Sequence, residues 1–307
     1  MTIDADGIVA RRRLRRWLSF WRVLAVVTGA ALILGTVAVL TGFDPIGSRP
    51  HILRVTVSGI VFDDPEILLG LADAADNDST LAVLVVIDTP GGTTTGGESI
   101  YRELRRIGER GVPVVAVIRT VGASAGYMVA LAAGRIYALE TSITGSIGVL
   151  LETAEVSGLL ERLGVTAETF RSAPLKGQPS LFQPLNDQTR VATQSLIDDV
   201  YTWFLEIFAE RRGLPMDTAR DLADGRAYTG RQALSLGLID SIGGEREALE
   251  WLVEMRGIPV DVPVKDLDRE DTPATFFDLI TGLTKKTLLS ERLRLDGLMS
   301  VWHPAQN

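Results

Sequence analysis

A serine between small residues is the first candidate for chemistry in this sequence. Ser124 lies in the segment Gly-Ala-Ser-Ala-Gly, residues 122–126, where a strand-like run is followed by a helix-like one. Small neighbours let the backbone turn tightly and let a substrate reach the hydroxyl group. Backbone N–H groups at the start of a helix are also free to stabilise an oxyanion. Ser124 is therefore a candidate nucleophile, and its alternative role is that of an ordinary helix N-cap.

The general base that this serine would need is not a histidine. The chain has two histidines, His51 and His303, and the second lies near the C-terminus, so a Ser-His-Asp triad is hard to build. Four of the 31 basic residues are lysines, and Lys176 is the only one of them before residue 265. A lysine can act as a base once burial makes it neutral, whereas an arginine stays protonated. Lys176 is the candidate base, and its alternative role is that of a solvated loop residue.

Two consecutive glycines form the third candidate. Gly91 and Gly92 follow Pro90 at the end of another strand-like run. Without a Cβ atom the backbone can approach a ligand closely, and an N–H group can then point at a developing negative charge. An ordinary turn is the alternative, and the chain has no phosphate-binding motif of the G-x-x-x-x-G-K-[ST] type. Because cysteine is absent and histidine is scarce, we predict no metal site and no cofactor.

Strand-like and helix-like segments alternate through the middle of the chain. The alternation predicts an α/β fold with a mostly parallel sheet and crossover helices. In such sheets, functional groups gather where strands end and helices begin. A Pro- and Gly-rich loop after Arg171 precedes an expected amphipathic helix over residues 187–212. The expected strands are 52–61, 81–88, 112–120 and 135–139, and the expected helices between them are 65–78, 97–110 and 124–133.

An uncharged run near the N-terminus predicts one transmembrane helix. Residues 23–43 carry no charge, and as a helix they would be long enough to cross a bilayer core of about 30 Å. Six arginines precede this run, so the positive-inside rule leaves residues 1–22 in the cytoplasm and exports the rest of the chain. The alternatives are a cleaved signal peptide and a buried core helix. The run is longer than the usual apolar region of a signal peptide and ends without a good cleavage site.

The chain after the anchor divides into an exported domain, residues 44–265, and an amphipathic tail, residues 266–307. Residues 44–307 hold 25 basic and 37 acidic side chains, a net charge of −12, so nucleic-acid binding is set aside. Large apolar residues recur at near-helical spacing in the tail, between residues 276 and 289. We expect them to pack on another subunit of a homo-oligomer, on the membrane surface or on their own domain.

In this order the motifs resemble the signal peptide peptidase A family (protease IV type), whose members are membrane-anchored Ser-Lys peptidases. The resemblance implies a fold like that of the Clp protease subunit and the crotonases. It also implies degradation of signal peptides and other membrane-released peptides, outside the cytoplasm at a bacterial cell membrane. The matching segments are residues 88–93, 122–127, 141–149, Lys176 in its loop, and residues 225–240.

The same resemblance implies a role for each site residue. Ser124 would be the nucleophile, Lys176 the general base, and Ser146 a hydroxyl group that orients the lysine. The oxyanion donors would be the backbone N–H groups of Gly92 (or Gly91, if the register differs by one) and Ala125. The family often has glycine at this last position, and the change is small because only the backbone is used. Short single-domain members assemble into rings or domes, in which the lysine is thought to come from a neighbouring subunit.

Two other classes of protein stay open at this point. A crotonase-like enzyme acting on acyl-coenzyme A would share the fold, but it would need a CoA-binding region and normally works in the cytoplasm, against the predicted anchor. A non-catalytic membrane scaffold would keep the fold without the chemistry. The presence of Ser124 together with the solitary Lys176 argues against the scaffold.

Overall fold

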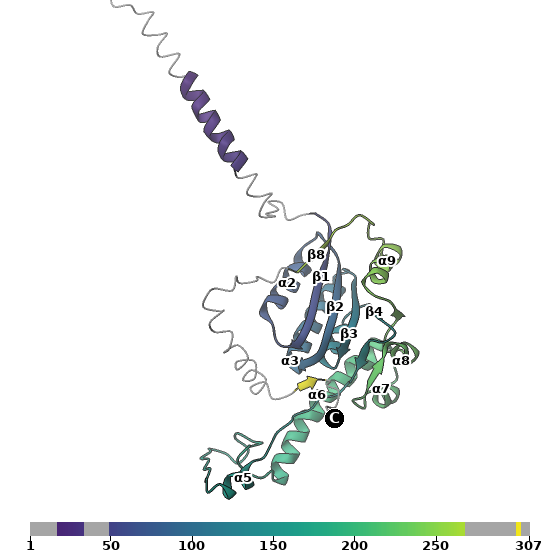
Figure 1. Ribbon diagram of the computed structural model, residues 1–307. Coiled ribbons are helices and arrows are strands. Elements are labelled where there is room, and N and C mark those ends of the chain that lie inside the picture. The colour runs from purple at the N-terminus through teal and green to yellow at the C-terminus, as the bar shows by residue number, and fades with distance from the viewer. Residues whose placement is uncertain (1–16, 34–48, 268–298, 302–307) are drawn as a thin grey trace, which may run out of the picture. The chain divides into compact units, whose positions relative to one another are not determined.

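A computed structural model describes residues 17–33, 49–267 and 299–301 of the chain (Figure 1). The chain divides into two units, Met1–Arg49 and Pro50–Asn307. Within the described part of the first unit, residues 17–33 form a helix with almost all side chains exposed. Among the described residues, no helix combines the length and apolarity needed to span a bilayer. Residues 34–43 of the predicted anchor, and most of the predicted tail after residue 267, lie outside the described residues.

The second unit is built on one largely parallel sheet. Its strands run in the order β6-β5-β3-β2-β1-β8; in addition, β4 pairs with β3, β7 pairs with β4, and β9 pairs with β2. Pairing is parallel except between β5 and β6 and between β2 and β9. The strands are β1 (His51–Val61), β2 (Thr80–Thr93), β3 (Val114–Ala123), β4 (Arg135–Ala138), β5 (Ile143–Gly145), β6 (Ala227–Thr229), β7 (Ser241–Ile242), β8 (Val264–Asp266) and β9 (Met299–Val301). The mixed α/β fold with a parallel sheet is thus as predicted.

Helices cover both faces of this sheet, as parallel strands require. Along β2, Val83, Val85 and Ile87 pack with α2, α3, α4 and the end of α6, whereas Leu84 and Val86 pack with α9 on the other face. This alternation is the period of two expected of a strand that is buried on both sides. The helices are α2 (Pro65–Asp76), α3 (Thr94–Glu109), α4 (Ala125–Ala130), α5 (Ser157–Arg162), α6 (Asp187–Arg212), α7 (Met216–Leu222), α8 (Gly230–Ser235) and α9 (Glu245–Arg256).

Several element boundaries differ from the sequence-based expectation, and those around the end of β2 and the end of α4 have local reasons. Strand β2 continues to Thr93 because its glycines keep pairing with β1, and α3 therefore begins at Thr94 rather than at residue 97. The Thr93 hydroxyl oxygen caps that helix by accepting the N–H of Gly96 at 3.1 Å. Helix α4 ends at Ala130, three residues before the expected end, in turns that lead into β4.

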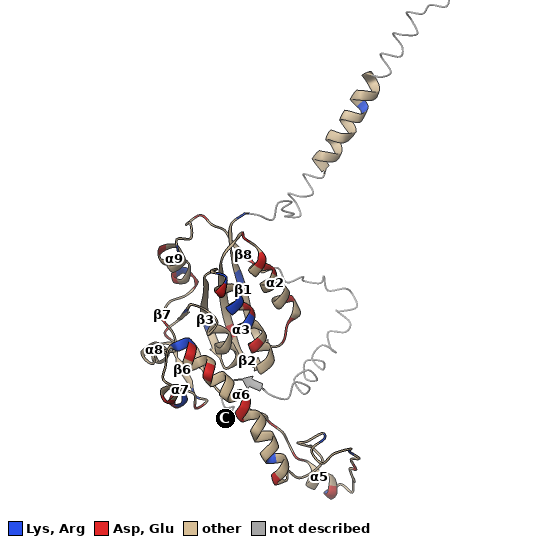
Figure 2. Cartoon of the chain, turned by 180° about the vertical axis from the view of Figure 1, so that it is seen from behind, with Lys and Arg blue, Asp and Glu red and all other residues tan. Residues whose placement is uncertain are grey.

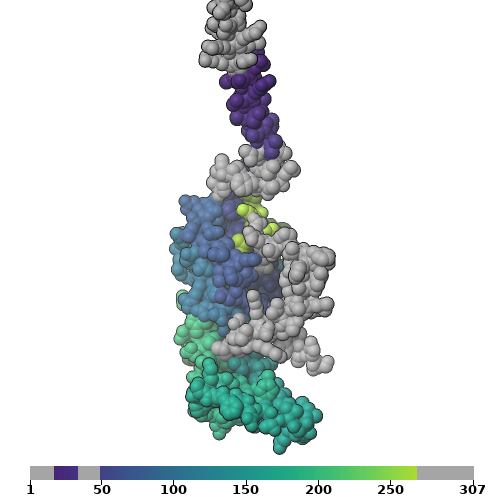
Figure 3. Space-filling view, turned by 90° about the vertical axis from the view of Figure 1, so that its left-hand side faces the viewer, coloured from purple at the N-terminus to yellow at the C-terminus, as the bar shows by residue number. Residues whose placement is uncertain are grey.

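A long projecting segment separates β5 from the end of α6. We call residues 149–186 the arm; no residue from 148 to 188 is buried, although the structure describes all of them. Figures 1, 2 and 3 agree that the arm and the first part of α6 extend beyond the sheet. Only the last part of α6 packs on the core, through residues such as Phe204 and Phe208, which are both 0% exposed. Within the part of the chain that the structure describes, the arm therefore has no buried residue that would fix it to the domain between its two ends.

Candidate active site

Ser124 lies at a sharp turn between a strand and a helix. It follows β3 directly, precedes α4, and is 1% exposed. Its backbone adopts φ 57° and ψ −119°, a region that residues with a Cβ rarely occupy. Ser124 does occupy the N-cap position of α4, but its side chain makes no hydrogen bond that caps the helix. A strained strand-to-helix turn of this kind presents a serine hydroxyl at the end of a sheet.

Ser146 turns in the same way on the neighbouring strand. The last residue of β3, Ala123, pairs with Gly145 at the end of β5, and the N–H of Ser124 donates to the Gly145 carbonyl at 2.8 Å. Ser146 follows with φ 50°, is 7% exposed, and donates its N–H to the Arg226 carbonyl at 2.9 Å. Among the residues that the structure describes, these two serines are the only non-glycine residues with positive φ.

Three hydrogen bonds hold α4 and the turn after it in place. The hydroxyl group of Tyr127 donates to the Leu238 carbonyl at 2.7 Å, and burial raises the pKa of this phenol, so it remains a neutral donor. Arg211, in the last turn of α6, donates to the carbonyl oxygens of Leu131 at 2.8 Å and Ala133 at 3.0 Å. The end of α6 is thereby bonded to the segment that follows α4.

Gly91 and Gly92 form the end of β2 beside this turn. A Cβ atom on Gly92 would lie 1.9 Å from the carbonyl oxygen of Val61, so no other residue fits between the two strands there. Gly91 has φ 118°, a conformation that a side chain rarely permits. The glycines therefore serve more than an ordinary turn, because both continue the pairing of β2 with β1.

The other edge of the same glycines carries an antiparallel strand. In β9, Val301 pairs with Gly91, Ser300 with Gly92, and Met299 with Thr93; β9 is the yellow arrow in Figure 1. Strand β3 pairs with β2 only as far as Thr89 and then leads to Ser124. The last residues of β2 thus offer a backbone edge that accepts an extended peptide strand.

Lys176 is not brought to Ser124 within this chain. It lies in the arm, is exposed, and donates its backbone N–H to the Ala173 carbonyl at 3.1 Å. Ser124 belongs to the buried core, as does Ala125, which is 0% exposed. The fold therefore assembles Ser124, Ser146, Ala125 and the two glycines at one end of the sheet and places the lysine on the projecting segment.

Sequence reasoning overlooked one buried residue at this site. Thr89 is 0% exposed and its hydroxyl group bonds to the backbone of the glycine segment. Its place in Asp-Thr-Pro-Gly-Gly was visible in the sequence, but a threonine in an apolar run is also an ordinary strand residue. Only the register of β1, β2 and β3 shows whether Thr89 is an ordinary strand residue or one that supports the glycine segment.

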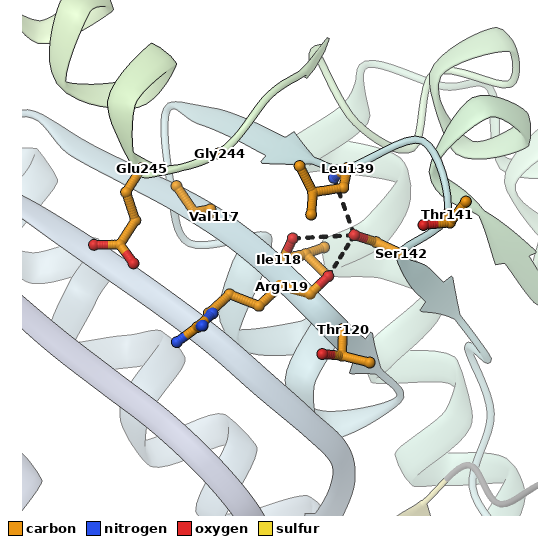
Figure 4. Close-up of a pocket in the computed structure, with 9 residues that line it drawn as sticks. All are labelled: Val117, Ile118, Arg119, Thr120, Leu139, Thr141, Ser142, Gly244 and Glu245. Atoms are coloured by element: carbon orange, nitrogen blue, oxygen red, sulfur yellow. Dashed lines mark hydrogen bonds between the residues drawn. The ribbon is translucent and has the colours of Figure 1, made fainter.

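A pocket elsewhere on the sheet is separate from this site. It has a volume of about 330 Å³, lies where β4 leaves β3 and α9 begins, and is lined by residues that include Arg119 and Glu245 (Figure 4). Ser142 closes one side, because its hydroxyl oxygen accepts the N–H of Leu139 at 3.0 Å and its O–H reaches the carbonyls of Ile118 and Arg119. None of the predicted site residues lines this pocket.

The chain is similar to known peptidases. Residues 106–258 match the model of Peptidase family S49. A protein of Synechocystis sp. that is named as a protease is 34% identical over 236 residues, which are 76% of this chain and 84% of that protein. A protein of Enterococcus faecium that is named signal peptide peptidase SppA is 30% identical over 218 residues, 67% of this chain and 63% of that protein.

A solved structure was also matched. It is that of a mutant of the 1510-N membrane-bound stomatin-specific protease, and the alignment has a TM-score of 0.47 and 16% identity and covers 73% of this chain and 100% of that one. The matched family region contains Ser124, Ser146 and Lys176. With that region and the Synechocystis relative matched over 84% of its length, this chain belongs to peptidase family S49 and is a serine peptidase.

Proposed function

We propose that this chain is a membrane-anchored serine endopeptidase that uses Ser124 as nucleophile and Lys176 as general base. Its substrates are signal peptides and other membrane-released peptides, cleaved outside the cytoplasm. The observation that carries the proposal is the pair of positive-φ serines at the ends of β3 and β5, beside the glycine edge of β2. Membership of a peptidase family favours hydrolysis over the scaffold and acyl-coenzyme A alternatives.

The reaction uses each site group once in acylation and again in deacylation. The neutral Nζ of Lys176 accepts the proton of the Ser124 hydroxyl as Oγ bonds to the peptide carbonyl carbon. The backbone N–H groups of Ala125 and Gly92, or Gly91, stabilise the oxyanion. The lysine then gives its proton to the leaving amine, the C–N bond breaks, and water activated by the same lysine hydrolyses the acyl-enzyme. Ser146 orients the lysine by hydrogen bonding.

The substrate binds as an extended strand along the glycine edge of β2. Residues 91–93 already pair with one antiparallel strand, β9, and main-chain hydrogen bonds of this kind give affinity without sequence preference. An apolar pocket of about 400 Å³ adjoins this region; its lining includes Val61, which pairs with Gly92, together with Ile60, Phe62, Ile67 and Ile100. Such a lining suits the apolar side chains of signal peptides.

A second copy of the chain supplies the lysine. In this chain Lys176 is exposed on the arm while Ser124 is 1% exposed at the sheet. The arm exposes large apolar side chains that its own domain does not cover, among them Phe170 at 92%, Leu163 at 67%, Leu159 at 57% and Phe182 at 48%. Exposed apolar surface on this scale marks an interaction site, and a head-to-tail contact repeated around an axis closes a ring.

Site-directed variants test the dyad. Ser124→Ala and Lys176→Arg should each lower kcat/KM for an apolar peptide by about 10²–10⁴-fold or more, because arginine keeps the charge but cannot accept the proton. Lys265→Arg, in β8, is the matched control and should leave turnover at the wild-type level. Substantial turnover by a folded Lys176→Arg protein would refute the dyad.

Mixing two inactive variants tests whether the lysine comes from a neighbour. Co-expressed Ser124→Ala and Lys176→Ala chains each retain one member of the dyad. If the site forms between subunits, random assembly should restore about a quarter of the sites. If Lys176 acts within its own chain, the mixture should stay as inactive as either variant alone.

A further inference from the structure

A buried threonine lies where β2 loses register with both of its neighbours. Thr89 is 0% exposed. The pairing of β2 with β3 shifts between Ile87 and Thr89, and the pairing with β1 shifts between Ser58 and Ile60. Irregularities of this kind remove ladder hydrogen bonds, and they are frequent next to active sites, where they re-aim the backbone. Some other group must then hold the displaced backbone in place.

The hydroxyl group of Thr89 provides that support for the glycine segment. Its oxygen accepts the N–H of Gly91 at 3.0 Å. Its hydrogen has two acceptors in reach, the carbonyl oxygen of Gly59 in β1 and that of Gly91 at 3.1 Å. The intervening Pro90 has no N–H group of its own to contribute. One buried hydroxyl therefore ties the start of the Gly91–Gly92 segment to β1.

The methyl group of Thr89 contacts the nucleophile helix. A Cβ atom on Gly126 would lie 2.6 Å from the Thr89 Cγ2 atom and 3.2 Å from the Thr89 carbonyl oxygen. Gly126 lies in the first turn of α4, two residues after Ser124. The two branches of a single side chain thus touch the two backbone segments that carry the proposed oxyanion donors.

We propose that Thr89 is a positioning residue that sets the spacing between the two oxyanion donors. Its hydroxyl places the glycine segment and its methyl places α4, so the N–H groups of Gly92 and Ala125 converge on one oxygen. This inference rests on the proposed peptidase mechanism. Oxyanion donors act only when both lie about 2.7–3.1 Å from the developing negative charge, and a misplacement of about 1 Å can cost 10²-fold in rate.

Removing the hydroxyl while keeping the shape of the side chain tests the first contact. Thr89→Val should lower kcat about 10–100-fold and change KM by less than about threefold, because the loss falls on the transition state. Thr89→Ser restores the hydroxyl but lacks the methyl group, so it should recover a large part of that loss without reaching the wild-type kcat. A kcat for Thr89→Val within about twofold of wild type would overturn the proposal.

A matched variant separates positioning from stability. The hydroxyl of Tyr201 donates to the Ala223 carbonyl at 2.9 Å, so Tyr201→Phe, like Thr89→Val, removes the hydrogen bonding of a hydroxyl group while nearly keeping the shape of the side chain. Both Tyr201→Phe and Thr89→Val should lower the thermal unfolding midpoint, but only Thr89→Val should lower kcat. Equal relative losses of kcat in the two variants would overturn the proposal, because Thr89 would then act through general stability.

A pair of substitutions of opposite size tests the contact between the Thr89 methyl group and α4. This test does not depend on whether Thr89→Val folds. Gly126→Ala pushes α4 away from the glycine segment and should lower kcat; Thr89→Ser removes the methyl group that the new Cβ meets. The double variant should therefore turn over at least about fivefold faster than Gly126→Ala alone. Additive losses would overturn the role of the methyl group. Turnover by Ser124→Ala would instead refute the peptidase mechanism itself, whatever Thr89 does.

Discussion

Ser124 and Ser146 are joined through one backbone hydrogen bond: the N–H of Ser124 donates at 2.8 Å to the carbonyl of Gly145, the residue directly before Ser146. Both serines then turn through positive φ, at 57° and 50°. Holding two adjacent strained turns costs free energy, about 1–3 kcal/mol each. Such strain persists where the surrounding structure enforces it, and at this site it directs two hydroxyl groups from neighbouring strands to one end of the sheet.

Gly92→Ala should damage both stability and catalysis. The added Cβ would lie 1.9 Å from the Val61 carbonyl oxygen, which is backbone, so β1 and β2 must separate. We expect a loss of about 1–3 kcal/mol in the free energy of unfolding and of about 10²-fold in kcat/KM. Gly108→Ala, in α3 with no atom within 4 Å of its Cβ, is the control and should be neutral or slightly stabilising. Urea titrations and peptide kinetics measure both effects.

Phe170→Ser should separate assembly from folding. This side chain is 92% exposed in the single chain, so its loss should barely affect packing within the domain. If the arm packs on a second copy, the variant should dissociate in light scattering and lose activity at an unchanged unfolding midpoint of the isolated chain. Val260→Ser changes an apolar side chain that is 84% exposed outside the arm, and it should alter neither property. A wild-type protein that is monomeric and fully active would contradict this prediction.

Ser300→Pro should increase turnover of added peptides. Ser300 pairs with Gly92, and proline removes its backbone N–H, which weakens the β9 pairing on the edge where we propose that substrate binds. Less competition by β9 should raise kcat/KM by about two- to fivefold. Ser300→Ala keeps the N–H group and should behave as wild type. A fall in kcat/KM for the proline variant would instead indicate that β9 completes the site.

A reporter fused after residue 307 should be active outside the cytoplasm. The prediction depends on the uncharged run 23–43 and the six arginines before it. The control is the same fusion without residues 23–43, which should remain in the cytoplasm. Cytoplasmic activity of the intact fusion would reverse the orientation and remove the reason to expect peptides released from the membrane as substrates.

The sequence by itself determined much of the local structure and showed which residues could take part in chemistry. Buried strands such as β2 and β3 read as apolar runs because both of their faces are covered, and the glycines and serines at their ends mark the turns. Lys176 could also be singled out from the sequence, because it is the only lysine before residue 265 and a residue type is known without the fold. These features depend on a few neighbouring residues, so they can be predicted from the sequence.

Only the tertiary structure decided which of these residues meet. The pairing of Ala123 with Gly145, and of Gly91 with both β1 and β9, joins segments far apart in the chain through backbone hydrogen bonds that carry no residue-type signature. The two contacts of Thr89 arise from shifts of register, which no local pattern encodes. The separation of Lys176 from Ser124 likewise depends on where β5 and α6 leave the core, because packing of distant apolar faces, rather than sequence spacing, sets those directions.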